Sequence, residues 1–299
     1  MKTEHYFNTF VLCLVLALGV GYWHSNVIPK DVPEKIEEIV ETEIIFDLDS
    51  ELLEARSVLV VDMKKNEILF SQNTTVPYPL ASLSKIVASL VALEEMQQES
   101  IIITLESIIQ SGDKGLLVGE EWGIDELVQF MLITSSNDAA YAIASSVGQE
   151  GEPVTQNFTR MMNRYVRNLG MSDTYFLGPT GLDDDFYGVT GYGTANDIYA
   201  LMKLATYTFP EVFLSSSMSN DWFTSRDNFV HQAKNTNTVV KNIPSLIFSK
   251  TGYTDGAGGN LAFMFEYGPH YPIGVVILGS TFDGRFDDAM TIIQSFQSE

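Results

Sequence analysis

The chain has 299 residues, a length that suits one large domain or two small ones. Hydrophobic residues make up 45% and charged residues 19%, an ordinary globular composition that can bury a core without covalent staples. The net charge of −22 argues against nucleic acid as a partner, because phosphate binding requires concentrated Lys and Arg. The single cysteine, Cys13, makes an intrachain disulfide impossible.

The N-terminal segment is almost wholly apolar from Tyr6 to Trp23. These 18 residues would span about 27 Å as a helix, close to the hydrocarbon thickness of a bilayer. We interpret residues 1–23 as a signal anchor or a cleaved signal peptide. The anchor is favoured because Tyr22 and Trp23 occupy the window where cleavage needs small residues, and because both side chains suit a membrane interface.

Residues 24–47 form a second segment, which carries two prolines and five glutamates. We interpret it as an acidic stalk, so that the globular domain comprises residues 48–299. The domain is predicted to begin with strand 56–63, a polar turn and a second strand over 67–70.

Helical spacing and capping residues predict a run of helices after this hairpin. The predicted helices cover residues 82–96, 124–133, 139–147, 154–169 and 195–204. Apolar runs then predict strands over 246–251, 260–266 and 273–278. Strands at both ends with helices between them indicate an α+β fold, in which one sheet joins the two ends of the domain around an inserted helical region.

Three short motifs stand in one order along the chain: Ser82-Leu83-Ser84-Lys85, Ser135-Ser136-Asn137 and Lys250-Thr251-Gly252. Together they form the S-x-x-K, S-x-N and K-T-G set of penicillin-binding proteins and serine β-lactamases. Each motif alone is weak, and Ser82 by itself would be read as an ordinary helix cap. The chain also contains a second S-x-x-K, residues 111–114, in a polar stretch that is predicted to be a loop.

The first motif supplies a nucleophile and a base. Ser82 is a weak nucleophile until a base takes its proton, and Lys85 lies one helical turn away on the same face. A lysine is normally protonated at neutral pH. Burial, with Lys250 nearby, would disfavour the charged form and allow Lys85 to act as the base.

The other motifs supply proton relay and substrate binding. Ser135 could pass the proton to the leaving amine, and Asn137 could bond both the lysine base and the substrate amide. The backbone N–H groups of Ser82 and Tyr253 are the natural oxyanion donors. Lys250 and Thr251 would hold a substrate carboxylate.

Other catalytic schemes find little support in the sequence. A Ser-His-Asp triad has only His231 and His270 available in the domain, and the chain contains no G-x-S-x-G. There is no His or Cys cluster with metal-ligand spacing. The acidic runs at 183–185 and 287–288 are interpreted as solvated loop residues.

The domain resembles the D-alanyl-D-alanine carboxypeptidases, the low-molecular-mass penicillin-binding proteins, over most of residues 56–290. The matching segments are ASLSK around Ser82, SSNDAA from Ser135, GPTGLDDD from Gly178, GTANDIYAL from Gly193, KTGYTDGAGGNLA from Lys250 and ILGSTFDGRFDD near the C-terminus. The resemblance implies a β-lactamase/transpeptidase-like fold, with an antiparallel sheet flanked by helices. It also implies that the enzyme removes the terminal D-alanine from peptidoglycan stem peptides through an acyl-serine, and that β-lactams inhibit it covalently. By the same resemblance, neither a metal nor an organic cofactor is expected.

By the same match, the substrate-binding residues would be Lys250, Thr251, Gly252, Tyr253 and Thr254, with Arg285 holding the terminal carboxylate. The substrate is extracytoplasmic, so the domain is expected outside the bacterial cell membrane, tethered by the N-terminal segment or secreted if that segment is cleaved. Many relatives carry a β-rich C-terminal domain and a C-terminal amphipathic anchor. We expect the N-terminal segment to replace that anchor here.

Three alternative functions stay open at this point. A murein DD-endopeptidase of the same family would carry the same motifs. A class A β-lactamase would need a deacylating glutamate in an E-x-x-L-N context, which is not found. An inactive cell-wall binding protein would keep the fold without turnover.

Overall fold

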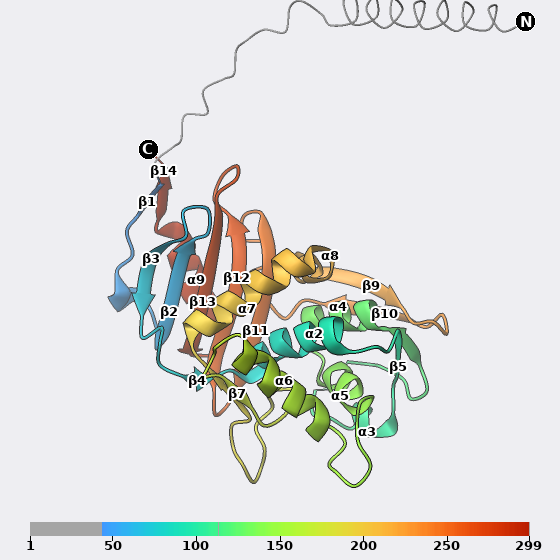
Figure 1. Ribbon diagram of the computed structural model, residues 1–299. Helices are drawn as coiled ribbons and strands as arrows, with labels where there is room; N and C mark the ends of the chain where they lie inside the picture. The colour runs from blue at the N-terminus through green and yellow to red at the C-terminus, as the bar shows by residue number, and fades with distance from the viewer. Residues whose placement is uncertain (1–43, 113, 299) are drawn as a thin grey trace, which may run out of the picture. The chain divides into compact units, whose positions relative to one another are not determined.

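A five-stranded antiparallel sheet forms the centre of the fold, with the strand order β11-β12-β13-β2-β3 (Figure 1). The computed structural model describes residues 44–112 and 114–298. The strands are β2 (Ser57–Asp62), β3 (Glu67–Gln72), β11 (Leu246–Thr254), β12 (Gly258–Glu266) and β13 (Pro272–Ser280). All five predicted strands are confirmed, and β11 continues past Thr251 to Thr254. Because β13 pairs with β2, the late strands close against the early hairpin, as the sequence pattern predicted.

Both faces of this sheet are covered by helices, which explains why β2 is apolar at consecutive positions. Val58 and Val60 belong to one hydrophobic cluster, together with residues of helix α9 (Gly284–Gln294). Leu59 and Val61 belong to a second cluster, together with residues of α7 (Ala195–Thr208) and the other helices. All four side chains are at most 4% exposed. Each contributes about 1.5–3 kcal/mol of burial free energy.

The predicted helical region lies between β3 and β11 in the chain, beside the α7 face of the sheet (Figure 1). Its main helices are α2 (Ser84–Glu95), α4 (Ile124–Thr134), α5 (Asn137–Ser145) and α6 (Gln156–Asn168), with the short α3 (Leu105–Ile108) and α8 (Pro210–Leu214). The first of these, α2, packs against α4, α6 and α7. Because neighbours surround it, every residue from Ser84 to Ala92 is buried. The five long helices predicted from spacing are confirmed.

The described residues also form four small sheets, one of which, β1 (Ile44–Phe46) with β14 (Phe296–Ser298), joins the two ends of the described fold; the other three belong to the middle of the chain. They are β5 (Ser100–Ile102) with β6 (Glu121–Gly123), the hairpin β9 (Asn220–Thr224) with β10 (Val230–Lys234), and β4 (Tyr78–Pro79) with β8 (Gly191–Gly193) and β7 (Tyr175–Phe176). The sequence analysis did not predict these short strands. In the β9–β10 hairpin, Phe223, His231 and Ala233 are buried against α4, while Trp222 and Val230 are exposed. Because the exposed Trp222 and Val230 are apolar, the sequence of this hairpin does not alternate clearly between apolar and polar residues.

The described fold begins earlier than the predicted domain boundary at residue 48. Strand β1 (Ile44–Phe46) pairs with β14 (Phe296–Ser298), and the rings of Phe46 and Phe296 lie 4.6 Å apart. Residues 44–47 therefore belong to the globular unit rather than to the stalk, because an apolar triplet follows the last glutamate. The predicted anchor and most of the stalk lie outside the described residues. Among the residues described, no helix is both long enough and apolar enough to span a membrane.

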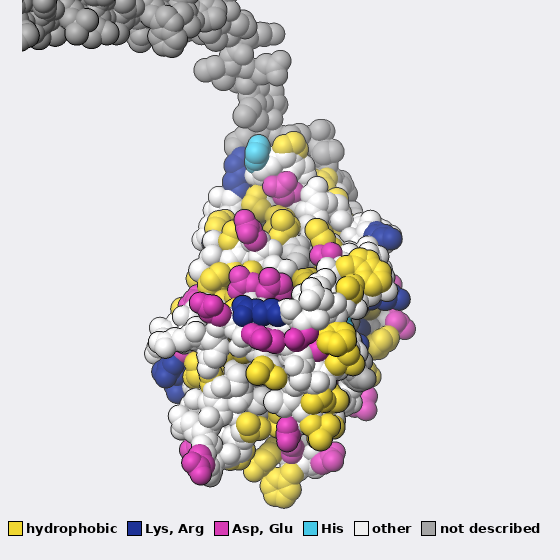
Figure 2. All heavy atoms as spheres, turned by 90° about the vertical axis from the view of Figure 1, so that its right-hand side faces the viewer, with side chains coloured by type: hydrophobic (Ala, Val, Ile, Leu, Met, Phe, Trp, Pro, Cys, Tyr) yellow, Lys and Arg dark blue, Asp and Glu magenta, His cyan; other side chains and the backbone are white. Residues whose placement is uncertain are grey.

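The surface carries the acidity that the composition indicates. Figure 2 shows acidic side chains spread over the face that carries the β9–β10 hairpin, whereas basic side chains do not gather there into a patch. Where a basic side chain lies on the hairpin loop, it is paired: Arg226 forms an ion pair with Glu121 at 3.1 Å. Concentrated positive charge is therefore not found on this face.

Candidate active site

Ser82 lies in a single 3-10 turn, Ala81–Leu83, that leads directly into α2. The helix begins at Ser84, two residues later than predicted. No side chain caps this helix start, so Ser82 is not the ordinary capping serine that the motif alone would suggest. Its Oγ lies 2.9 Å from Lys85 Nζ. The preceding Ala81 has a left-handed backbone with φ of 47°, a conformation that costs a non-glycine residue about 1 kcal/mol.

Lys85 is completely buried on α2 and is surrounded by three oxygen partners. Besides Ser82 Oγ, they are Asn137 Oδ1 at 2.7 Å and the Thr180 carbonyl at 2.6 Å. Burial is the main cause that lowers the pKa of Lys85 to about 7, and the charge of Lys114 lowers it further. A neutral amine can donate to two of these oxygens and accept the hydroxyl proton of Ser82 with its lone pair.

Ser135 connects α4 to α5 at a left-handed residue with φ of 59°. This conformation ends α4, and Ser136 then caps α5 by accepting a hydrogen bond from the Ala139 amide at 3.0 Å. The sharp connection places Ser135 Oγ 2.7 Å from Lys250 Nζ. The S-x-N motif is therefore built from a helix end, a helix cap and the first residue of the next helix.

Asn137 joins the catalytic residues to the loop that precedes β6. Its Oδ1 accepts from Lys85, and its Nδ2 donates to the Ser111 carbonyl at 2.6 Å. The predicted bond to Lys85 is confirmed. One of the two amide hydrogens is already used by Ser111, which leaves the second for the predicted bond to substrate.

Lys250 is buried on β11, where it donates to Ser135 Oγ and, at 2.9 Å, to the Thr251 carbonyl. Burial, followed by the charges of Lys85, Arg285 and Lys114, holds its pKa well below the usual range for lysine. The sequence analysis expected Lys250 to lower the pKa of Lys85. The structure shows this repulsion between Lys85 and Lys250, and the charge of Lys114 also lowers the pKa of Lys85.

Gly252 lets β11 approach the turn that carries Ser82. A Cβ added at this position would lie 2.8 Å from the Leu80 carbonyl oxygen and 3.2 Å from the Ser82 nitrogen. The motif glycine is therefore required by close backbone approach. The adjacent Thr251 is buried, and its Oγ1 lies 2.6 Å from Thr236 Oγ1.

Arg285 is the second residue of α9, and its side chain contacts β11. Its Nη1 donates to the Gly252 carbonyl at 3.0 Å, and its Nε has no hydrogen-bond partner among the described residues. The guanidinium lies over the rings of Phe282, at 4.6 Å, and Tyr253, at 5.7 Å. Burial lowers the pKa of Arg285 to about 10, so the side chain is charged at neutral pH.

These side chains border a cavity of about 330 Å³. Its lining comprises Ser82, Gly112, Lys114, Thr134, Ser135, Asn137, Leu182, Asn235, Thr236, Thr238, Thr251, Gly252, Tyr253, Phe282 and Arg285. The structure thus brings together the predicted residues, with Lys85 and Lys250 buried beneath Ser82 and Ser135.

Thr254 differs from the prediction, because it does not line this cavity. Its hydroxyl instead donates to Asp183 at 2.9 Å, which ties the acidic loop 183–185 to the end of β11. The loop acids are therefore only partly free in solvent.

The sequence analysis missed Lys114 and the segment 235–238 as parts of the site. Thr236 is fixed by its hydroxyl contact to Thr251, a partner that no local pattern reveals. Lys114 belongs to the second S-x-x-K, which was set aside as a loop. The loop assignment is confirmed, yet the loop reaches the cavity. The only signal in the sequence was its polar, glycine-containing composition.

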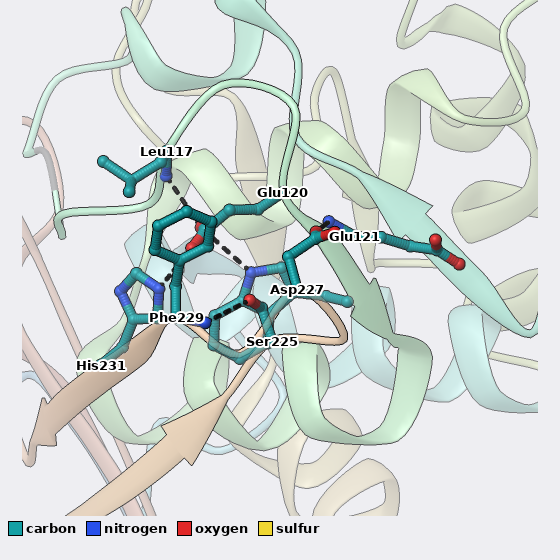
Figure 3. Close-up of polar contacts among 8 residues, drawn as sticks. Leu117, Glu120, Glu121, Ser225, Asp227, Phe229 and His231 are labelled. Atoms are coloured by element: carbon teal, nitrogen blue, oxygen red, sulfur yellow. Dashed lines mark hydrogen bonds and ion pairs between the residues drawn. The ribbon is translucent and has the colours of Figure 1, made fainter.

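The histidines do not form the rival triad. His231 is buried on β10 with its Nε2 2.7 Å from Glu120 Oε1, and His270 lies exposed at the turn before β13. Figure 3 shows the His231 ring directed toward the Glu120 carboxylate. Within the described part of the chain, no group of three His, Cys, Asp or Glu side chains could hold a metal ion.

Comparison with known proteins agrees with this site. The chain is similar to D-alanyl-D-alanine carboxypeptidase DacF of Bacillus subtilis, with 27% identity over 76% of this chain and 58% of the relative. It is 26% identical to the D-alanyl-D-alanine endopeptidase of Escherichia coli, over 68% of this chain and 64% of the relative. It therefore spans only about six tenths of these two relatives.

The fold also matches solved structures. Penicillin-binding protein D2 of Listeria monocytogenes, in its ampicillin-bound form, superposes with a TM-score of 0.65 and 26% identity, covering 81% of this chain and 97% of that one. A family model described as D-alanyl-D-alanine carboxypeptidase matches residues 46–281, which include all three motifs but end before Arg285. Because that match spans most of the chain, the protein belongs to the D-alanyl-D-alanine carboxypeptidase family of serine peptidases, family S11.

Proposed function

We propose that this protein is a serine-type D-alanyl-D-alanine carboxypeptidase that removes the terminal D-alanine from peptidoglycan stem peptides. The observation that carries the proposal is the contact of 2.9 Å between Ser82 Oγ and the buried Lys85 amine. A pKa of about 7 leaves a large share of Lys85 neutral at physiological pH. The nucleophile and its base are thus adjacent and in the protonation states that acyl transfer requires.

Acylation begins when Ser82 Oγ attacks the carbonyl carbon of the penultimate D-alanine. The Oγ–C bond forms while the hydroxyl proton passes to Lys85, and the peptide C–N bond then breaks. The proton on Lys85 then passes through the Ser135 hydroxyl to the leaving amine, which returns Lys85 to its neutral form. The Ser135 Oγ is held 2.7 Å from Lys250 Nζ. The backbone N–H groups of Ser82 and Tyr253 are assigned to the developing oxyanion.

Deacylation uses the same groups in reverse. A water molecule adds to the acyl carbon and gives one proton to the neutral amine of Lys85. The Oγ–C bond breaks, and the proton returns to Ser82 from the lysine. Lys85 is suited to both steps because its pKa of about 7 favours proton transfer in either direction near neutral pH.

The substrate's terminal carboxylate fits the arginine end of the cavity. Arg285 keeps its Nε unbonded among the described residues although this atom is buried, and such an orphan donor is costly unless a ligand satisfies it. The Thr251 hydroxyl and the Lys250 ammonium lie on the strand that Arg285 contacts. A carboxylate bound there would receive charge-assisted hydrogen bonds.

A murein DD-endopeptidase is the second candidate, since a relative with 26% identity carries that name. Both reactions cleave after a D-alanine through an acyl-serine, and they differ in what leaves. A free D-alanine leaves in one, and a cross-linked peptide leaves in the other. Product analysis on uncross-linked and cross-linked muropeptides separates them.

We further propose that the domain works outside the cell membrane, tethered by residues 1–23. The apolar N-terminal segment and the extracytoplasmic location of peptidoglycan support this placement. Fractionation of cells that express the full chain, followed by protease treatment of intact protoplasts, tests it. A protein recovered in the cytosol, or protected from the protease, would contradict it.

The function itself is tested by intact mass of the full-length protein after incubation with benzylpenicillin, beside its Ser82→Ala variant. The expected result is a lasting adduct on the parent alone, together with release of D-alanine from a pentapeptide. Penicillin consumed without an adduct would indicate a β-lactamase. An adduct without D-alanine release, but with cleavage of cross-linked muropeptides, would establish the endopeptidase.

A further inference from the structure

Lys114 is a cation of the active-site cavity that the three motifs do not use. It lies on the loop between α3 and β6, and it lines the cavity together with the neighbouring Gly112. No hydrogen bond or ion pair to a described residue occupies its ammonium, whereas its backbone N–H is held by Asp138 Oδ2 at 3.1 Å. Because Lys114 is exposed and lines the cavity, a ligand bound there can contact its side chain.

The loop that carries Lys114 is fastened to the catalytic helix α5 at its start. The Ser111 carbonyl accepts from Asn137 Nδ2 at 2.6 Å, and the Lys114 amide donates to Asp138. Both partners belong to the first turn of α5, next to Ser135. The backbone beneath Lys114 is thus positioned by the residues that position the S-x-N motif.

The same loop is fastened to the β9–β10 hairpin at its other end (Figure 3). The buried carboxylate of Glu120 accepts from the Leu117 amide at 2.9 Å and lies 2.7 Å from His231 Nε2. Next to it, the Glu121 amide donates to Asp227 at 2.7 Å. A loop held at both ends presents its lysine with a smaller loss of conformational entropy on binding.

The described part of the cavity wall carries two basic side chains, which could bind two anionic groups. Among the described residues, Lys114 and Arg285 line it and no aspartate or glutamate does, although the whole chain carries a net charge of −22. The loop that carries Lys114 lies against Asn137: the Ser111 carbonyl accepts from Asn137 Nδ2, and a Cβ added at Gly112 would lie 3.4 Å from that nitrogen. Arg285 instead donates to the Gly252 carbonyl on β11. Lys114 is therefore on the Asn137 side of the cavity, and the arginine that fits the terminal carboxylate is on the β11 side.

We propose that Lys114 binds a second carboxylate of the substrate, carried by the acyl residue that precedes the two D-alanines, and so selects anionic acyl donors over neutral ones. This proposal rests on the proposed function. The arginine end of the cavity takes the carboxylate of the leaving group. The lysine end takes the side-chain carboxylate of the acyl group, for which an ammonium is a flexible point-charge partner.

The test compares two peptides that differ only in charge, acetyl-Glu-D-Ala-D-Ala and acetyl-Gln-D-Ala-D-Ala. For the full-length protein at low salt, we expect kcat/KM to favour the glutamyl peptide about fivefold, as for a partly exposed charge pair. Lys114→Gln should remove the preference, Lys114→Arg should keep it, and Lys114→Glu should reverse it. The preference should also weaken as salt is raised.

Lys65→Gln serves as the matched control, because Lys65 is an exposed lysine in the turn between β2 and β3. It should keep the parent preference. A parent that cleaves both peptides equally, or a Lys114→Gln variant that keeps the preference, would overturn the proposal. A merely structural role for Lys114 would lower both rates together and would leave their ratio unchanged.

A second measurement separates this proposal from the proposed function. Carbenicillin adds one carboxylate to the side chain of benzylpenicillin, on the acyl side of the bond that opens. If no D-alanine is released but the parent acylates Ser82 faster with carbenicillin than with benzylpenicillin, and Lys114→Gln loses this ratio, the carboxypeptidase assignment fails and the anion preference stands. If neither penicillin acylates Ser82, both fail.

Discussion

The two S-x-x-K segments of this chain border the same cavity and play different parts in it. In residues 82–85 a 3-10 turn holds the serine hydroxyl against a lysine that is completely buried. In residues 111–114 the serine contributes its carbonyl to Asn137, and the lysine is exposed at the cavity wall. One sequence pattern thus forms the pair proposed as nucleophile and base in one place, and a charged part of the cavity wall in the other. Burial and local backbone conformation decide which chemistry the pattern performs.

The largest expected effect is the difference in acylation rate between the Ser82→Ala and Ser111→Ala variants. Ser82→Ala removes the atom that is acylated, so acylation by benzylpenicillin should fall by at least about 10⁴-fold. Ser111→Ala keeps the carbonyl that binds Asn137 and should stay within about twofold of the parent. Intact mass and stopped-flow acylation rates measure both. A penicillin adduct on Ser82→Ala would show that another residue is the nucleophile.

The second prediction concerns the base. Lys85→Gln keeps a polar side chain of similar length but cannot take a proton, and it should lower the acylation rate by about 10²–10⁴-fold. In the parent, burial holds the pKa of Lys85 at about 7, and only the neutral amine can accept the serine proton. The acylation rate should therefore rise with pH through about 7 and level off above it.

The pH profile has its own control. Lys65→Gln, on the exposed β2–β3 turn, should reproduce the parent curve. A parent rate that is flat between pH 5 and 9, or that falls as pH rises through 7, would contradict the assignment of Lys85 as the base.

The third prediction concerns Glu120, whose carboxylate connects the end of the Lys114 loop to His231 of the β9–β10 hairpin. Glu120→Ala leaves the Leu117 amide and the buried side chains of Trp122 and His231 without their common partner. We expect a loss of about 3 kcal/mol in the free energy of unfolding. For a domain of this size the melting temperature should fall by about 6–12 °C.

Glu121→Ala is the matched control for this change. Its carboxylate pairs with Arg226 at the surface, where the two side chains are 40% and 48% exposed. Such pairs contribute less than about 1 kcal/mol. Equal melting temperatures for the two alanine variants would mean that the buried Glu120–His231 contact does not stabilise the fold.

The parts of the fold and of the site that the sequence predicts are those that depend on local patterns of residues. The core strands and helices were predictable because apolar periodicity is local: β2 and α2 are buried along their length and apolar throughout. The motif residues were predictable because their order and spacing are specific. The contact between Ser135 and Lys250 joins positions 115 residues apart, and only the known motif set connects them.

The parts that could not be predicted depend on tertiary placement. Lys114 has the sequence surroundings of any solvated loop, and it becomes a site residue only because α5 binds the loop backbone. The sequence analysis weighed His231 only as one of two histidines available to a triad, and its partner Glu120 lies 111 positions earlier and is buried with it. In both cases the decisive contact is a hydrogen bond between distant segments, for which a single sequence contains no periodic signal.

The smallest expected effect tests whether the charge of Lys114 influences the pKa of Lys85. The positive charge of Lys114 lowers the pKa of Lys85, so Lys114→Gln should move the acid limb of the acylation profile to higher pH. At pH 6 the rate should drop by about threefold relative to the parent, and at pH 9, where Lys85 is neutral in both proteins, the rates should agree. Lys114→Arg keeps the charge and should restore the parent limb. If Lys114→Gln lowers the rate equally at both pH values, the loop lysine supports the shape of the cavity and does not tune the base.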